Sequence, residues 1–82
     1  MYLEIITPDK KIFEGEVESA IFPGSKGSFQ VLNNHAALVS SLAKGKVSFR
    51  NSRKENTELI VTGGVVEVLN NHIILLAEGI EE

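Results

Sequence analysis

Hydrophobic and polar residues alternate with a period near two along most of the chain, in short segments. In the first segment, for example, Leu3 and Ile5 fall on one side and Glu4 on the other. This period is typical of β-strands that bury one face. The final segment, His72 to Ala77, is instead a continuous apolar run, which predicts a strand covered on both faces. The predicted strands are residues 2–7, 11–13, 16–22, 28–32, 46–50, 58–62, 65–69 and 72–77.

Turn-forming residues separate these segments at short intervals. They are the pairs 8–9, 14–15, 23–24, 26–27, 33–34, 44–45, 51–52, 63–64 and 70–71, each of which contains Gly, Pro or Asn. Gly63 and Gly64 predict positive φ angles or a bend in the sheet. Pro23 has no amide hydrogen and is expected to end the ladder of its strand. The pattern predicts an all-β fold, a small antiparallel β-sandwich of two sheets or flattened barrel, with residues 1–82 as a single domain.

Residues 36–43 fit two secondary structures. A helix here would be capped by Asn34 and stopped by Gly45, and its alanines and leucines favour that state. A strand would have two alternating faces, the first of which carries Leu38, Ser40 and Leu42. The pattern alone leaves both structures open. The acidic tail after Ala77 is expected to have no partner within the chain.

Composition narrows the possible functions. The chain has 82 residues, of which 43% are hydrophobic and 23% charged, as in globular proteins. Its net charge of −3 argues against nucleic-acid binding, which usually needs a basic stripe. The absence of cysteine excludes disulfides and thiolate metal sites. No apolar run approaches the roughly 20 residues that span a bilayer, so any membrane contact is expected to go through a partner.

None of the potentially reactive residues has the neighbours that catalysis requires. His35 and His72 are the only histidines, and no His-x-x-His or Asp-x-Asp spacing accompanies them. Ser40 and Ser41 lie outside any Gly-x-Ser-x-Gly elbow. Residues 24–27 contain two glycines but lack the Gly-Lys-Ser/Thr of a phosphate loop. The sequence therefore predicts no catalytic residue, no metal site and no cofactor.

Three kinds of binding function remain open to an all-β chain of this length. Biotinyl and lipoyl carrier domains present a lysine at a hairpin tip, which here would be Lys10 or Lys11, although the two halves of the chain do not match. An oligonucleotide-binding barrel needs aromatic residues beside basic ones. The five aromatic residues of this chain mostly occupy core-like positions instead. A free-standing protein-interaction module is the third possibility.

Several segments, taken in order, resemble the epsilon subunit of F-type ATP synthases. They are Phe13-Glu14-Gly15, residues 24–31, residues 35–38, Gly45 and residues 62–68. Each piece is weak alone, but together they extend over nearly the whole chain with few or no gaps. The resemblance implies a two-sheet sandwich and makes residues 37–42 a strand. It also implies a non-catalytic central-stalk subunit, which links the gamma subunit to the membrane c-ring and helps couple ion translocation to ATP synthesis.

The resemblance further implies two contact surfaces. The loop expected to face the c-ring consists of Ser25, Lys26, Gly27 and Ser28. The wall expected to contact the gamma subunit consists of His35, Leu38, Ser40 and Leu42, whose small and apolar side chains allow close approach. Leu38 and Leu42 could instead belong to the core, with the gamma surface elsewhere. Such a subunit would be peripheral on the ATP-synthesising membrane, on the cytoplasmic face of a bacterial inner membrane.

Two departures from the family pattern bear on these expectations. Residues 33–37 read Asn-Asn-His-Ala-Ala where the family usually has Pro-Gly-His-Ala-Pro. Because Asn tolerates the left-handed conformation, the turn is expected to survive with Asn34 in place of glycine. Typical members also continue into a C-terminal helical hairpin that can inhibit ATP hydrolysis. The few residues after Glu78 cannot form that hairpin, so this regulation is not expected here.

Overall fold

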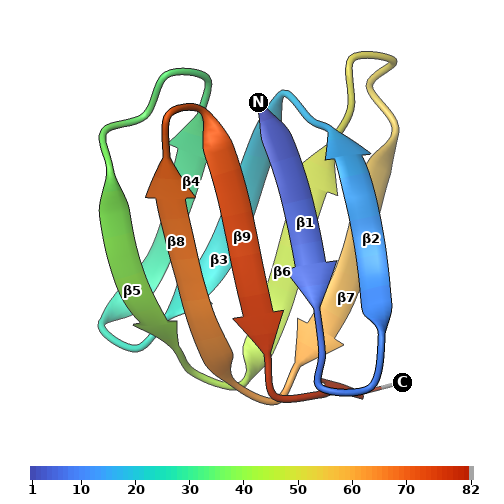
Figure 1. The fold of residues 1–82 in the computed structure, drawn as a ribbon, viewed down its shortest axis with the longest axis vertical. Coiled ribbons are helices and arrows are strands. Elements are labelled where there is room, and N and C mark those ends of the chain that lie inside the picture. The colour runs from blue at the N-terminus through green and yellow to red at the C-terminus, as the bar shows by residue number, and fades with distance from the viewer. Residues whose placement is uncertain (82) are drawn as a thin grey trace.

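The computed structural model describes residues 1–81, which form ten β-strands (Figure 1). They are β1 (Tyr2–Ile6), β2 (Lys11–Glu16), β3 (Ser19–Gly24), β4 (Gly27–Leu32), β5 (Leu38–Leu42), β6 (Gly45–Arg50), β7 (Asn56–Val61), β8 (Gly64–Leu69), β9 (His72–Ala77) and β10 (Ile80–Glu81). No helix occurs in this part of the chain. The ambiguous segment 36–43 thus forms the strand β5, and the predicted all-β fold is confirmed.

Hydrogen bonds connect nine of these strands along one path, which folds over into two layers, and β4 pairs with β3 beside that path. The front layer, nearer the viewer in Figure 1, contains β5, β8, β9, β1 and β2. The rear layer contains β4, β3, β6, β7 and β10. They are joined at one corner, where Gly24 of β3 pairs with Leu42 of β5. The shortest dimension of the molecule is 20 Å, which fits two sheets stacked about 10 Å apart with side chains on their outer faces.

One strand pair departs from the antiparallel arrangement expected throughout. β1 and β9 lie side by side and run parallel, with Tyr2 opposite His72 and Ile6 opposite Leu76. A tight hairpin can join antiparallel strands only, whereas parallel neighbours need a long connection. Here the chain between β1 and β9, which contains most of the sandwich, supplies that connection. Residues from near both ends of the sequence therefore meet in the middle of the front layer.

The core lies between the two layers and is lined by alternate residues of each strand. The front layer contributes Leu3, Ile5, Val66, Val68, Ile73 and Leu75 to it. The rear layer contributes Ala20, Phe22, Val31, Val47, Phe49 and Val61. Phe22 is the largest of the fully buried side chains, and its ring lies 5.8 Å from that of Phe29. Burial of this kind stabilises the fold by about 1.5–3 kcal/mol for each large apolar side chain.

The path of β3 differs from its prediction at Pro23. The strand continues through Pro23, which lies opposite Ser28 of β4, and ends at Gly24. On the other edge of β3, the ladder to β6 stops at Ile21. Gly24 and Gly27 flank a two-residue turn and form its hydrogen-bonded pair. Because hydrogen-bonded and non-hydrogen-bonded pairs alternate along antiparallel strands, the next pair, Pro23 and Ser28, is a non-hydrogen-bonded one. The missing amide hydrogen therefore costs no bond in that ladder, and the expectation that Pro23 ends it was wrong.

The last two strands also correct the sequence analysis. In β9, Ile73 and Leu75 are fully buried, but Leu76 is 54% exposed, so this strand is covered on one face only. The tail, which was expected to have no partner, forms β10, where Ile80 pairs with Val61 of β7. Ile80 is partly buried and packs against the core.

Two turns contain asparagines in the left-handed conformation, which the sequence predicted for Asn34. Asn34 has a φ of 63°, so asparagine does take the left-handed conformation at this position. Asn70 and Asn71, with φ of 50° and 61°, close the hairpin between β8 and β9. Such left-handed pairs suit two-residue hairpins, since their twist matches that of the strands. The side-chain oxygen of Asn71 accepts a hydrogen bond of 2.8 Å from the Asn34 amide and so ties the two turns together.

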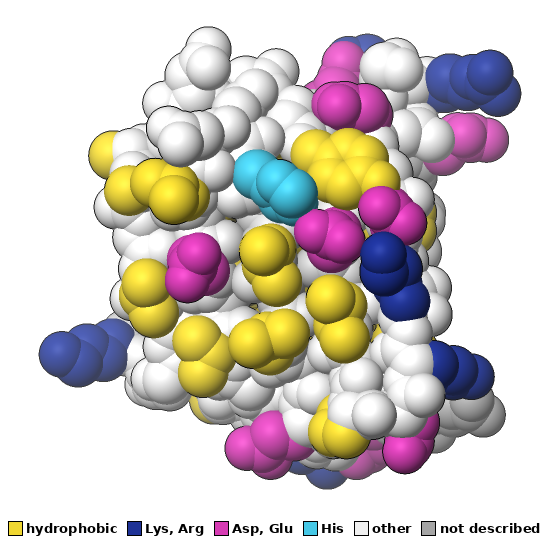
Figure 2. Space-filling view, in the orientation of Figure 1, with side chains coloured by type: hydrophobic (Ala, Val, Ile, Leu, Met, Phe, Trp, Pro, Cys, Tyr) yellow, Lys and Arg dark blue, Asp and Glu magenta, His cyan; other side chains and the backbone are white. Residues whose placement is uncertain are grey.

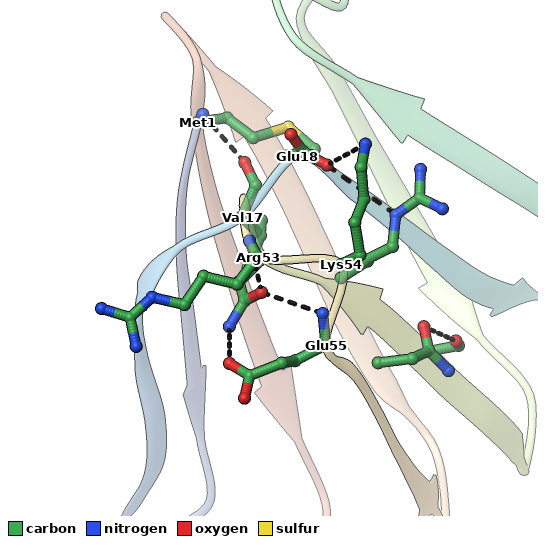
Figure 3. A network of polar contacts seen from close by, with 10 residues as sticks. Met1, Val17, Glu18, Arg53, Lys54 and Glu55 are labelled. Carbon is green, nitrogen blue, oxygen red and sulfur yellow. Dashed lines mark hydrogen bonds and ion pairs between the residues drawn. The ribbon is translucent and has the colours of Figure 1, made fainter.

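The connection between β6 and β7 contains the basic residues of the chain's most polar stretch. Figure 3 shows Lys54 beside Glu18 and the hydrogen bonds within the connection. Arg50 and Lys54 lie 3.8 and 3.4 Å from Glu18, and the Asn51 side chain accepts hydrogen bonds from two amides within the loop. Beside them, the Met1 ammonium group donates to the Val17 carbonyl at 3.1 Å. These basic groups thus serve contacts within the chain, each exposed pair contributing about 0–1 kcal/mol.

Candidate interaction surfaces

The loop predicted to face the c-ring forms the turn between β3 and β4. Ser25 and Lys26 are its tip, between the paired residues Gly24 and Gly27. The turn is fastened to β5, since the Ser25 amide donates to the Ser41 carbonyl at 3.0 Å and the two serine hydroxyls lie 2.9 Å apart. Lys26 is exposed and belongs to no ion pair within residues 1–81. The loop therefore presents an unpaired ammonium group on a fixed backbone.

Three of the residues predicted to contact the gamma subunit share the inner side of β5. Leu42 is only 6% exposed, Leu38 packs against the core, and Ser40 lies between them. Leu38 and Leu42 thus face the core, as the alternative left open by the sequence had it, and strand alternation turns the other residues outward. The outward side chains of β5 are Val39, which is 71% exposed, and Ser41. A contact between β5 and another subunit stays a prediction, and these two residues would make it.

His35, the fourth residue predicted for that wall, lies in the loop between β4 and β5. It is exposed, and its ring Nδ1 is 2.8 Å from the Ala36 carbonyl oxygen. In Figure 1 this loop is at the upper end of β5, whereas the turn with Lys26 is at the lower end. The structure thus separates the two predicted surfaces along the length of one strand.

The outer surface of the front layer was not predicted from the sequence. Figure 2 shows hydrophobic side chains gathered there. We call this surface the front face and define it by Val39, Val65, Glu67, Leu69, Ile74 and Leu76. Four of the six large hydrophobic side chains that are exposed within residues 1–81 belong to it: Val39, Val65, Leu69 and Leu76. The sequence feature that indicated this surface was the apolar run of residues 73–76. Such a run also fits a strand with one face in the core and an apolar face exposed to solvent.

A network of polar side chains borders the front face on β1, β2 and β9. Lys11 donates to Glu4 at 3.3 Å and to Glu14 at 3.1 Å, and His72 Nε2 lies 2.8 Å from Glu4. The bonds from His72 and then Lys11 lower the pKa of Glu4. The Tyr2 hydroxyl and then Lys11 lower the pKa of Glu14, while the two carboxylates raise the pKa of Lys11. These pKa shifts favour the ionised forms, so the network is a charged border to an apolar surface.

The lowered pKa of Glu4 predicts how stability depends on acid. A carboxyl group whose folded pKa lies below its ordinary value of 4.5 stabilises the fold above that pH, and this contribution is lost as pH falls through the folded pKa. The stability difference between the wild type and Glu4→Gln should therefore shrink on acidification below about pH 4.5. Urea denaturation at several pH values measures it. Glu67→Gln, which breaks no ion pair within residues 1–81, is the control, and a pH-independent difference for Glu4→Gln would contradict the prediction.

Within residues 1–81, no group of three or more His, Cys, Asp or Glu side chains is arranged to hold a metal ion. None of these residues forms a helix that is long and apolar enough to cross a membrane. The chain is a two-layer all-β sandwich, and its apolar outer face is the kind of exposed patch that marks an interaction site.

The comparison with protein families identifies the chain more closely. The model of the β-sandwich domain of the ATP synthase delta/epsilon chain matches residues 1–82. The chain belongs to this family. The resemblance to epsilon subunits that the sequence motifs indicated is thereby confirmed, and the carrier-domain alternative is not supported.

Similar proteins are epsilon chains of bacterial ATP synthases. The chain is 44% identical to the ATP synthase epsilon chain of Chlorobium limicola over 78 residues, which cover 95% of this chain and 89% of that one. It is 45% identical to the one from Chlorobaculum tepidum, covering 93% and 86%. With the epsilon chain of Campylobacter concisus the identity is 35%, covering 96% of this chain but only 61% of that one. The chain therefore spans most of some relatives and less than two thirds of others.

Solved structures with the same fold come from two mitochondrial ATP synthases. A chain in the OSCP/F1/c-ring structure of the Euglena gracilis enzyme superposes with a TM-score of 0.90 at 20% identity, covering 96% of this chain and 51% of that one. A chain in the central stalk/c-ring structure from Tetrahymena thermophila gives 0.83 at 19% identity, covering 99% and 65%. At these identities the likeness establishes the fold alone.

Proposed function

We propose that the chain is a non-catalytic subunit of the central stalk of an F-type ATP synthase. It would link the gamma subunit to the membrane c-ring and help couple ion translocation to ATP synthesis. The observation that carries this proposal is the family match along the whole chain, with epsilon chains as relatives. ATP synthase epsilon chains belong to a membrane-associated complex. The proposed place of this chain is peripheral, on the cytoplasmic face of a bacterial inner membrane.

The gamma subunit is proposed to occupy the front face. Apolar side chains such as Val39 and Leu76 remain in contact with water in the isolated chain, and their burial contributes about 25 cal/mol for each Å² covered. β5, the strand expected to meet the gamma subunit, adds its outward residues Val39 and Ser41 to this surface. The proposal thus keeps the strand that the sequence indicated and changes the side chains that make the contact.

The c-ring is proposed to bind the turn of Ser25, Lys26, Gly27 and Ser28. This turn and the front face are joined by short contacts, because Ser25 is bonded to Ser41 at the lower end of β5. Close-packed sheets deform little, so a force applied at one surface passes to the other through the same rigid body. Such stiffness suits a spacer between two rotating parts.

A reconstitution experiment tests this function. The wild-type chain is expected to bind an F1 sector that has been stripped of its epsilon chain, and the resulting complex to bind purified c-ring. Lys26→Glu should leave the first step unchanged and weaken the second about two- to fivefold at low salt, since an exposed ion pair contributes about 0–1 kcal/mol. The difference should disappear at high salt, where exposed charges are screened.

Lys10→Glu is the matched control for the c-ring step. Lys10 is an exposed lysine in the turn between β1 and β2, at the same end of the sandwich. If both reversals weaken c-ring binding equally, the charge of that end matters and the assignment of the β3–β4 turn is wrong. If the wild-type chain fails to bind the stripped F1 sector, the proposed function itself is contradicted.

A further inference from the structure

A single carboxylate lies in the middle of the front face. Glu67 is on β8, directly opposite Val39 of β5 on one side and Ile74 of β9 on the other. It is exposed, and within residues 1–81 it takes part in no ion pair and no side-chain hydrogen bond. Opposite charges across a strand pair stabilise a sheet, but both neighbours of Glu67 are apolar. The fold thus gains no cross-strand ion pair from a glutamate at this position.

Glu67 also lies where two hollows of the front face meet. One hollow, of about 400 Å³, is lined by Val39 and Leu69 together with Glu67. The other, of about 260 Å³, is lined by Glu67, Leu69 and Ile74, and it reaches His72. Both can receive apolar side chains of a docked segment. The carboxylate then stands between two apolar contacts, at a place that any such segment would cover.

The charges around Glu67 specify what the covering segment must contain. Glu4 and Glu14 at the border of the face are paired with Lys11, and His72 is engaged with Glu4. Glu67 is therefore the carboxylate on this surface without a cation, and Figure 2 shows acidic side chains set among the hydrophobic ones. Covering an unpaired carboxylate with apolar groups would oppose binding strongly. A partner that supplies a positive charge removes this cost.

We infer that the segment docked on the front face carries an Arg or Lys side chain that pairs with Glu67, between apolar side chains that fill the two hollows. The inference rests on the proposed function, in which the gamma subunit occupies this face. An arginine suits the site well, since its guanidinium group is planar, weakly hydrated and able to bind a carboxylate through two hydrogen bonds. Glu67 would then select the partner and fix its register.

The test measures the affinity of the labelled chain for the stripped F1 sector. Glu67→Gln is expected to weaken binding about tenfold, which corresponds to about 1.4 kcal/mol, and Glu67→Lys at least about a hundredfold. Both losses should be smaller at high salt. Thermal unfolding of the isolated variants should match the wild type, because Glu67 makes no polar contact within residues 1–81. Glu58→Gln and Glu58→Lys, on β7 of the rear layer, are the controls and should bind as the wild type.

The outcomes distinguish failure of the inference from failure of the proposed function. If the wild-type chain binds and Glu67→Lys binds equally well, the inference fails while the proposed function stands. Equal losses for the Glu67 and Glu58 reversals would also overturn it, since net charge alone would then explain the effect. If a Lys→Glu or Arg→Glu change in the gamma subunit restores binding of Glu67→Lys, the pairing cation is identified. Absence of wild-type binding would refute the proposed function and this inference with it.

Discussion

Replacing Gly64 with alanine is expected to destabilise the chain by at least about 3 kcal/mol, which is a large fraction of the stability of a small domain. Gly64 begins β8 with a φ of 151°, a conformation that side chains disfavour. A Cβ atom there would overlap the carbonyl oxygen of Leu76 and lie 3.0 Å from the Ala77 Cα. Both atoms belong to the backbone of the paired strand β9, so neither can move aside without disrupting the ladder.

Gly27→Ala is the matched control for this prediction. Gly27 also has a positive φ, of 132°, but a Cβ at that position would meet no atom within 4 Å. Its substitution should cost only the backbone strain, about 1–2 kcal/mol. Urea denaturation followed by circular dichroism measures both changes. Similar losses of stability for the two variants would show that the positive φ alone determines the cost. The backbone of β9 could then move to accommodate the added Cβ at position 64.

The strands of this protein could be located from the sequence because alternation and turn residues are local signals. Where one face of a strand is buried and the other is polar, as with Leu3, Glu4 and Ile5, the period of two marks the strand and its inner face together. Turns followed from residue types with a known backbone preference, and Asn34 has the predicted left-handed conformation. The family motifs then fixed β5 as a strand, which local preference had left open.

The apolar front face could not be predicted, because it depends on contacts between distant segments. In β9, Leu75 is buried and Leu76 exposed, yet the sequence shows only consecutive apolar residues. Alternation is absent there because the outer face is apolar too, as expected of a face that another chain covers. In β5, two alternating faces were evident, but the burial of Leu42 and the pairing of Ser40 with the buried Val66 show which one points inward. The apolar surroundings of Glu67 likewise follow from strand pairing, which places it opposite Val39 and Ile74.

The polar border of the front face could not be predicted from the sequence for the same reason. Glu4 and His72 are near opposite ends of the sequence and become neighbours through the parallel pair β1 and β9. No spacing rule connects residues that far apart. Sequence reasoning placed His72 at the start of the final strand but found no spacing that gave it a partner. Its contact with Glu4 depends on a topology that alternation and turns do not determine.

Two adjacent leucines of β9 are expected to give opposite results when each is replaced by glutamate. Leu75 is fully buried, so Leu75→Glu places a carboxylate in the core without a partner and should unfold the chain. Leu76 is 54% exposed on the front face, so Leu76→Glu should keep the fold, with a melting temperature within about 3 °C of the wild type. Its binding to the stripped F1 sector should nevertheless fall at least about a hundredfold, since an unpaired charge would be covered by the partner.

Leu76→Gln and Val65→Gln extend this comparison along the same face. Val65 is paired with Leu76 across β8 and β9 and is 42% exposed, so both neutral variants should stay folded and bind more weakly than the wild type. Ile21→Gln, at an exposed apolar position of the rear layer, should bind normally. Normal binding by folded Leu76→Glu would place the gamma subunit away from the front face. Loss of binding by Ile21→Gln would instead move the docking surface to the rear layer.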